Sequence, residues 1–182
     1  MFHYLVKESD LNNGNGMLIM NELSKSGIKI FNAHAKLGTL PLTRKELIDF
    51  LETPELLIHL GTVDKNGEPD DARPTWYYFD SLKDRLYVAT NKKLSKMVGN
   101  LQKSKAISFC IDDSRPDKYK GVRGKGDVSI CHDVESNATI FENIAARYVQ
   151  ADENYLSETK KGDYVILEIK PRYYSTWTIK AS

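Results

Sequence analysis

The sequence predicts a mainly β (α+β) fold, in which a six-stranded antiparallel barrel carries helices on its outside. The first observation is Asn66-Gly67 between two apolar runs, a strong hairpin signal because both residues tolerate positive φ. The second is that tight turns join the runs between residues 57 and 90. Such turns require antiparallel pairing and exclude a parallel sheet built from repeated crossover helices.

The expected strands are short apolar or aromatic runs bounded by turn residues. Pro171 lies inside the last run, and it predicts a bulge or a sheet edge because proline cannot donate a ladder hydrogen bond. The six expected strands cover residues 57–63, 70–79, 85–90, 105–112, 119–131 and 163–179.

Three helices are expected from start signals and helical spacing. Thr43 and Glu46 have the spacing of a capping box, which begins a helix over 43–53 that ends before Pro54. Asp133 is a plausible N-cap for a third helix. Its expected buried face holds Ile140, Phe141, Ile144, Ala145 and Tyr148. A second helix, over 92–103, is expected from the i, i+3, i+4, i+7 spacing of Leu94, Met97, Val98 and Leu101.

The 182 residues divide into a domain over 39–182 and an N-terminal extension over 1–38, whose role the sequence does not indicate. The extension is interpreted as an arm or a pair of helices. A formal net charge of +1 argues against a nucleic acid or an anionic membrane as partner. The longest apolar runs hold four residues, far short of the ~20 that span a bilayer, and we expect a cytoplasmic location without a signal peptide.

Neither a metal site nor a redox pair is predicted. The four histidines, at positions 3, 34, 59 and 132, are never three or four residues apart, as ligands on one helix face would be. Cys110 and Cys131 are expected to be buried free thiols rather than a disulfide.

The segment Thr90-Asn91-Lys92-Lys93-Leu94-Ser95-Lys96 lies where an expected strand ends and a helix begins. A helix N-terminus offers unpaired amides and about half a positive charge, so added hydroxyl and ammonium groups favour a phosphate site. An ordinary capped helix with solvated lysines remains the alternative.

Arg73 stands in an otherwise aromatic stretch, Arg73-Pro74-Thr75-Trp76-Tyr77-Tyr78. Strand alternation sends Arg73, Thr75 and Tyr77 to one face and Trp76 and Tyr78 to the other. Because an unpaired buried guanidinium is costly, Arg73 must meet an anion or a partner. The alternative is a salt bridge to Glu68, Asp70 or Asp71 on a solvated face.

The order of these pieces resembles the pyridoxamine 5'-phosphate oxidase-like, FMN-binding split-barrel family over about residues 43–130. The resemblance is carried by residues 57–63, Asn66-Gly67-Glu68-Pro69, Arg73-Pro74-Thr75-Trp76-Tyr77, residues 86–90, Ser95-Lys96 and Gly99-Asn100-Leu101, with a weaker match over residues 171–177. It implies a six-stranded split β-barrel that forms a two-fold homodimer, with two FMN molecules in the clefts between subunits.

The resemblance also implies site residues. Arg73 matches the strand residue that reaches the FMN phosphate, and Pro74, Thr75 and Trp76 match the stretch along the flavin ring. Thr90, Asn91, Ser95 and Lys96 fall at the strand end and helix start that hold the same phosphate. Trp177 resembles an aromatic residue that approaches the flavin, with core packing as the alternative.

A departure from the family bears on the substrate. Pyridoxamine phosphate oxidases end in a Trp followed by an Arg-x-His pattern, whereas this chain ends Trp177-Thr178-Ile179-Lys180-Ala181-Ser182. We therefore expect no vitamin B6 oxidation. The expected function is an FMN-dependent oxidoreductase that transfers a hydride between a reduced donor and a small organic acceptor. The alternatives are a reductase that uses the deazaflavin coenzyme and a non-catalytic flavin-binding module; other branches of the family bind haem. No catalytic residue is predicted.

Overall fold

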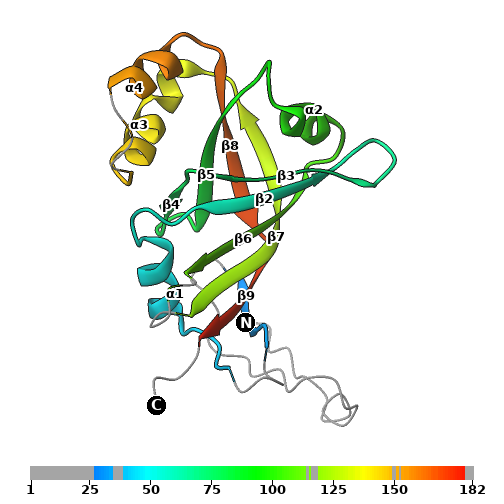
Figure 1. The fold of residues 1–182 in the computed structure, drawn as a ribbon, viewed down its shortest axis with the longest axis vertical. Coiled ribbons are helices and arrows are strands. Elements are labelled where there is room, and N and C mark those ends of the chain that lie inside the picture. The colour runs from blue at the N-terminus through cyan, green and yellow to red at the C-terminus, as the bar shows by residue number, and fades with distance from the viewer. Residues whose placement is uncertain are drawn as a thin grey trace, which may run out of the picture.

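The computed structural model describes residues 27–34, 39–113, 115, 119–148, 151 and 153–178. Within these residues nine strands form a single sheet, and four helices lie around it (Figure 1). The strands are β1 (Lys29–Asn32), β2 (Ile58–Val63), β3 (Pro69–Thr75), β4 (Tyr78–Asp80), β5 (Arg85–Asn91), β6 (Ala106–Asp113), β7 (Lys120–Cys131), β8 (Tyr164–Pro171) and β9 (Tyr173–Thr178). The helices are α1 (Arg44–Leu51), α2 (Lys96–Lys103), α3 (Val134–Ala145) and α4 (Glu153–Lys160).

The sheet is antiparallel along the order β3-β2-β6-β7-β8-β5-β4, and β9 pairs with β7 outside this path. Figure 1 shows the β2–β3 hairpin running across the long strands β7 and β8, so the sheet is strongly curled. The predicted mainly β, antiparallel fold with flanking helices is confirmed. One pairing is parallel: β1 lies beside β9, with Ile30 opposite Tyr174.

The single strand expected over 70–79 is wrong, because the chain leaves the sheet at Trp76 and Tyr77 and β3 and β4 are separate. The Tyr77 amide donates to the Tyr148 hydroxyl oxygen at 3.0 Å, and the Tyr77 hydroxyl donates to the Leu51 carbonyl at 2.8 Å. These bonds replace ladder bonds and draw Tyr77 into the core. The last expected strand is likewise divided after Pro171, where the Arg172 amide donates to the Lys125 carbonyl.

The predicted helix starts at Thr43 and Asp133 are confirmed. Thr43 and Glu46 form the capping box, and the Asp133 side chain accepts from the Glu135 amide. Helix α2 instead begins at Lys96 rather than 92, and Leu94 is 84% exposed instead of packing on the core. The sequence did not predict α4. No helix among the described residues is long and apolar enough to cross a membrane.

The main core fills the inside of the curled sheet, and Ile28 and Ile30 of the predicted N-terminal extension belong to it. Residues 1–26 and 35–38 of that extension, on which most of the arm or helix-pair interpretation falls, lie outside the described residues. A second cluster packs α3 and α4 on the other side of β5 and β8, at one end of the molecule (Figure 1). Its buried members are Tyr87, Phe141, Ile144, Tyr148 and Ile166.

Cys110 and Cys131 are free thiols, half-buried rather than fully buried. Burial raises the pKa of both thiols above the ordinary value. Within the described part of the chain, no group of three or more His, Cys, Asp or Glu residues could hold a metal ion.

Candidate functional site

The Arg73 guanidinium joins three elements that are distant in sequence. Arg73 lies on β3, which is an edge strand of the sheet, and its side chain alternates with the exposed Ala72 and Pro74. Its Nη2 donates to Thr90 Oγ1 at the end of β5 and to Ser95 Oγ at the start of α2, each at 2.6 Å. We call Arg73, Thr90 and Ser95 the hydroxyl–arginine cluster.

The two hydroxyls of this cluster are buried, with Thr90 5% and Ser95 8% exposed. Each accepts from Arg73 and still carries its own proton, so each can donate to another acceptor. Ser95 occupies the N-cap position of α2, yet its side chain makes no capping bond to that helix. The cluster therefore concentrates hydrogen-bond donors beside a helix N-terminus, where negative charge is favoured.

One buried nitrogen of the Arg73 guanidinium has no hydrogen-bond partner among the described residues. This nitrogen is Nε, and the carboxylate oxygen Asp71 Oδ2 is 4.0 Å away from it. A buried donor without a partner costs free energy. An anion that reaches this nitrogen and the two hydroxyls would remove that cost, so a phosphate fits the cluster chemically.

Lys96 stands next to Ser95 as the first residue of α2, but its charge is shared. Its Nζ is 3.5 Å from Asp70 Oδ1, and both side chains face solvent. The other oxygen of Asp70 accepts from Asn100 Nδ2 at 3.0 Å. The hydrogen bond from Asn100, followed by the nearby Lys96 charge, holds the pKa of Asp70 below its usual value.

Asn91 shapes the loop that leads to α2. Its Oδ1 accepts from the Lys93 and Leu94 amides, and its carbonyl accepts from the Ser95 amide. Lys92 and Lys93 instead bind the turn before β8, where Lys92 Nζ donates to the Gly162 carbonyl and Lys93 Nζ pairs with Asp163. Asn91 thus positions Ser95, while the two lysines are held away from the cluster.

The predicted ring-contact residues do not share one surface. Thr75 alternates to the same side as Arg73, whereas Pro74 is exposed on the opposite side. The Trp76 ring stacks on Tyr148, with centroids 4.9 Å apart and planes at 9°. It also meets Tyr155 of α4 edge-on at 5.2 Å. The Trp76 ring therefore packs against the second hydrophobic cluster, the one that joins α3 and α4 to the sheet.

Trp177 lies on β9, at the end of the molecule away from α2 (Figure 1). It is 8% exposed, packs over Gly121 of β7 and meets the His34 ring edge-on at 5.3 Å. A side chain at Gly121 would collide with the indole, so this packing depends on glycine. Within one chain, the structure brings Arg73, Thr90 and Ser95 together, with Asn91 and Lys96 beside them, and leaves Trp177 apart.

The sequence reasoning missed Asn100 as part of the site. Asn100 follows Lys96 by four residues on α2, a spacing that puts both side chains on one helix face. That spacing was the available signal. Of the carboxylates expected as salt-bridge partners of Arg73 in the alternative interpretation, Asp71 forms a long ion pair, with 4.0 Å between Arg73 Nε and Asp71 Oδ2.

Comparison with known proteins gives a family match and several similar structures. The family model described as Pyridoxamine 5'-phosphate oxidase matches residues 43–178. A structure of an F420 reductase is 25% identical, with a TM-score of 0.52 over 70% of this chain and 94% of that chain. Among curated proteins, no sequence matches.

Two further structures share the fold at lower identity. The conserved hypothetical protein Rv2991 from Mycobacterium tuberculosis is 20% identical, with a TM-score of 0.63 over 78% of this chain and 91% of that chain. An FAD-binding protein from Mesorhizobium loti is 16% identical, with a TM-score of 0.58 over 78% of this chain and 99% of that chain.

Proposed function

The chain belongs to the pyridoxamine 5'-phosphate oxidase family, and we propose that it is an FMN-binding oxidoreductase that transfers a hydride between a reduced donor and a small organic acceptor. One observation carries the proposal: a single guanidinium nitrogen meets two buried hydroxyls, Thr90 at the end of a strand and Ser95 at the start of a helix. A flavin-binding protein needs such a donor-rich site for the cofactor phosphate.

In this proposal Arg73 holds the FMN phosphate through Nε and its guanidinium edge, and the Thr90 and Ser95 hydroxyls donate to the remaining phosphate oxygens. Lys96 adds a point charge from the solvent side. The flavin supplies the hydride chemistry when bound. The chain's own residues bind and orient it, and we assign no protein group as acid or base.

The test compares FMN with riboflavin, which lacks the phosphate. Arg73→Ala should weaken FMN binding by about 1.5–3 kcal/mol, the scale of a hydrogen bond to a charged group. Riboflavin binding should change far less. Lys96→Ala should have a smaller effect because Lys96 is exposed and shared with Asp70. Quenching of flavin fluorescence measures the affinity of each protein, unaltered and variant, for both flavins.

Lys65→Ala provides a matched control, because Lys65 is an exposed lysine in the β2–β3 turn, away from the cluster. It removes the same charge as Lys96→Ala and should leave FMN affinity unchanged. If Arg73→Ala weakens FMN and riboflavin equally, the phosphate is held elsewhere and this assignment fails. The double variant Arg73→Ala/Lys96→Ala should lose less FMN binding free energy than the sum of the two single losses, since two groups that share one anion are coupled.

A deazaflavin-dependent reductase is the second candidate, and it is supported by the likeness to an F420 reductase. The absorbance spectrum of the isolated protein, with mass spectrometry of the released ligand, separates these candidates. A yellow protein whose flavin is bleached by NADH or NADPH supports the FMN oxidoreductase. A colourless protein that binds only the deazaflavin coenzyme supports the second candidate. A yellow protein inert to every reductant would be a non-catalytic flavin-binding module.

We further propose a homodimer, because β3 and β4 end the sheet order as edge strands that pairing would cover. A two-fold dimer would also give two equivalent flavin clefts. Light scattering at micromolar concentration should return about twice the 20.7 kDa chain mass. A monomer that still binds flavin would contradict the dimer without affecting the phosphate site.

A further inference from the structure

Asp70 lies at an irregularity in the β2–β3 ladder, beside the hydroxyl–arginine cluster. The register pairs Thr62 with Asp71 and then Val63 with Pro69. Asp70 is thus an extra residue of β3, opposite no residue of β2 in this register. An extra residue of this kind is a β-bulge, which bends a strand and re-aims a side chain. The bulge therefore decides which face of the sheet receives the Asp70 carboxylate.

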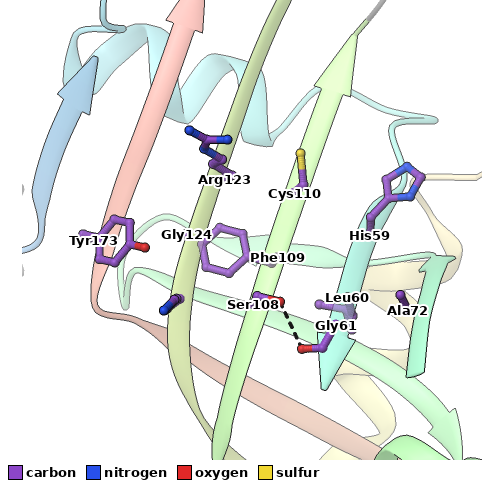
Figure 2. Close-up of a pocket in the computed structure, with 11 residues that line it drawn as sticks. His59, Leu60, Gly61, Ala72, Ser108, Phe109, Cys110, Arg123, Gly124 and Tyr173 are labelled. Carbon is purple, nitrogen blue, oxygen red and sulfur yellow. Dashed lines mark hydrogen bonds between the residues drawn. The ribbon is translucent and has the colours of Figure 1, made fainter. Parts of the chain in front are cut away.

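Regular alternation would turn Asp70 away from the cluster. Ala72, two residues along β3, lines a hollow on the outer face of the sheet together with His59 (Figure 2). Residues two apart on a strand share a face, so β3 without a bulge would place Asp70 on that outer face and Arg73 on the other. Instead the Asp70 side chain meets α2, the helix whose N-cap residue binds Arg73.

Two residues of α2 contact the Asp70 carboxylate. Asn100 Nδ2 donates to Asp70 Oδ2 at 3.0 Å and to Oγ1 of the buried Thr62 at 3.1 Å. This amide therefore fixes the carboxylate against the end of β2. Asp70 Oδ1 lies 3.5 Å from Lys96 Nζ. Lys96 is thus paired with a carboxylate of its own chain at the entrance to the cluster.

A phosphate at the cluster would compete with Asp70 for this ammonium group. The Lys96 side chain is 76% exposed and has a flexible stem, so Nζ can turn from one anion to another. The Asp70 carboxylate is tied to Asn100 and is less free to follow it. Binding of the phosphate by Lys96 must break the pair with Asp70, and that cost lowers the affinity for the anion.

We propose that Asp70 limits the affinity of this site for the cofactor phosphate, by holding Lys96 until the phosphate displaces it. The inference rests on the proposed flavin function and names the residue that regulates the same site. A flavin held against this competitor is bound more weakly, and exchanges more readily, than one held by an unopposed lysine.

Asp70→Asn tests the inference, because asparagine keeps an oxygen that can accept from Asn100 but carries no charge to attract Lys96. FMN should bind this variant about two- to five-fold more tightly than the unaltered protein, the range expected for an exposed ion pair. Riboflavin affinity should stay the same. Glu68→Gln is the matched control, since it removes an exposed carboxylate from the same hairpin and should change neither affinity. Quenching of flavin fluorescence measures each affinity.

The same substitution in Lys96→Ala separates competition from direct repulsion. Without Lys96, the gain in FMN binding free energy from Asp70→Asn should fall by more than half, because no cation is released. A gain that keeps half or more of its size would mean that Asp70 repels the phosphate directly, and it would overturn the inference. An equal gain in Glu68→Gln, or no gain in Asp70→Asn, would overturn it as well.

Arg73→Ala, measured alongside, distinguishes a failure of this inference from a failure of the proposed function. If Arg73→Ala weakens FMN far more than riboflavin while Asp70→Asn changes neither affinity, the phosphate site stands and only the role of Asp70 is refuted. If Arg73→Ala weakens both flavins alike, or the unaltered protein binds no FMN, both proposals fail.

Discussion

Ser95 illustrates how one side chain sets the chemistry of the candidate site. A serine at an N-cap normally accepts from its own helix and stabilises it by about 1 kcal/mol. Here the hydroxyl accepts from Arg73 instead, and α2 goes without that side-chain cap. No Ser95 side-chain bond therefore occupies the amides of the first turn of α2. Unpaired amides at a helix start favour the binding of an anion.

The protonation of Asp70 offers a direct test of this neighbourhood. The Asn100 hydrogen bond and the Lys96 charge lower the pKa of Asp70 in the folded protein. The resulting stabilisation is present above the ordinary carboxyl pKa and is lost as pH falls through the lowered folded value. Asn100→Leu should raise the pKa of Asp70 toward that ordinary value. Carboxyl carbon NMR across an acid titration measures the midpoint.

Asp133 serves as the internal reference for that titration. Its pKa is lowered by bonds from Ser136 and the backbone at the start of α3, so Asn100→Leu should leave it unchanged. An Asp70 midpoint that stays the same in the variant would show that Asn100 does not hold the carboxylate in solution.

At the residue scale, the sequence predicts polar partners better than aromatic ones. An arginine in an aromatic strand and a hydroxyl-rich junction before a helix both need partners, and Arg73, Thr90 and Ser95 are each other's partners. Trp76 is different, because its stacking partner Tyr148 is 72 residues away, in the loop that follows α3. No spacing rule connects those two rings.

At the element scale, Tyr148 divides the predicted strand over 70–79 into β3 and β4. Its hydroxyl donates to the Leu56 carbonyl at 2.7 Å and accepts from the Tyr77 amide at 3.0 Å, and all three groups are buried. Tyr148→Phe keeps the ring but leaves two buried backbone groups without a partner. The free energy of unfolding should fall by about 1–3 kcal/mol.

Urea denaturation measures this loss, and Tyr119→Phe is the control, since Tyr119 is 48% exposed. The control should stay within about 0.5 kcal/mol of the unaltered protein. An unchanged stability for Tyr148→Phe would mean that water replaces the lost bonds and that the bend at Tyr77 does not depend on them.

The start of a helix is predictable from the sequence when nearby side chains determine it, and not when residues distant in the sequence do. The starts at Thr43 and Asp133 follow from side chains within three residues, so the sequence predicts them correctly. The start of α2 does not, because Lys92 and Lys93 are bound to the Gly162–Asp163 turn some 70 residues later. Those contacts, together with the Asn91 side chain that accepts from the Lys93 and Leu94 amides, hold residues 92–95 as a loop before the helix.

At the scale of the whole molecule, hairpins are predictable from sequence and the closing pairings are not. Tight turns indicate β2–β3 and β4–β5, and both pairs are present. The pairing of β5 with β8 and of β1 with β9 joins segments more than 70 residues apart. Such pairings are decided by which apolar faces meet in the core, and a single sequence does not state that.

The place of β1 bears on the predicted domain boundary at residue 39. Ile28 and Ile30 are 6% and 2% exposed within the main core, and β1 supplies the parallel partner of β9. Burial of each isoleucine contributes about 1.5–3 kcal/mol. We therefore expect the folded unit to begin before residue 29.

Two shortened chains test this boundary, one beginning at residue 27 and the other at residue 39. The second lacks β1, so β9 loses one of its two partner strands and the core loses two isoleucines. Its free energy of unfolding should be lower by about 2–5 kcal/mol, the sum of both side chains reduced for burial retained in the unfolded chain. Urea denaturation of both chains gives the difference, and comparing them with each other isolates residues 27–38 from everything before them. Equal free energies would place the boundary at residue 39 and make β1 an attached arm rather than part of the fold.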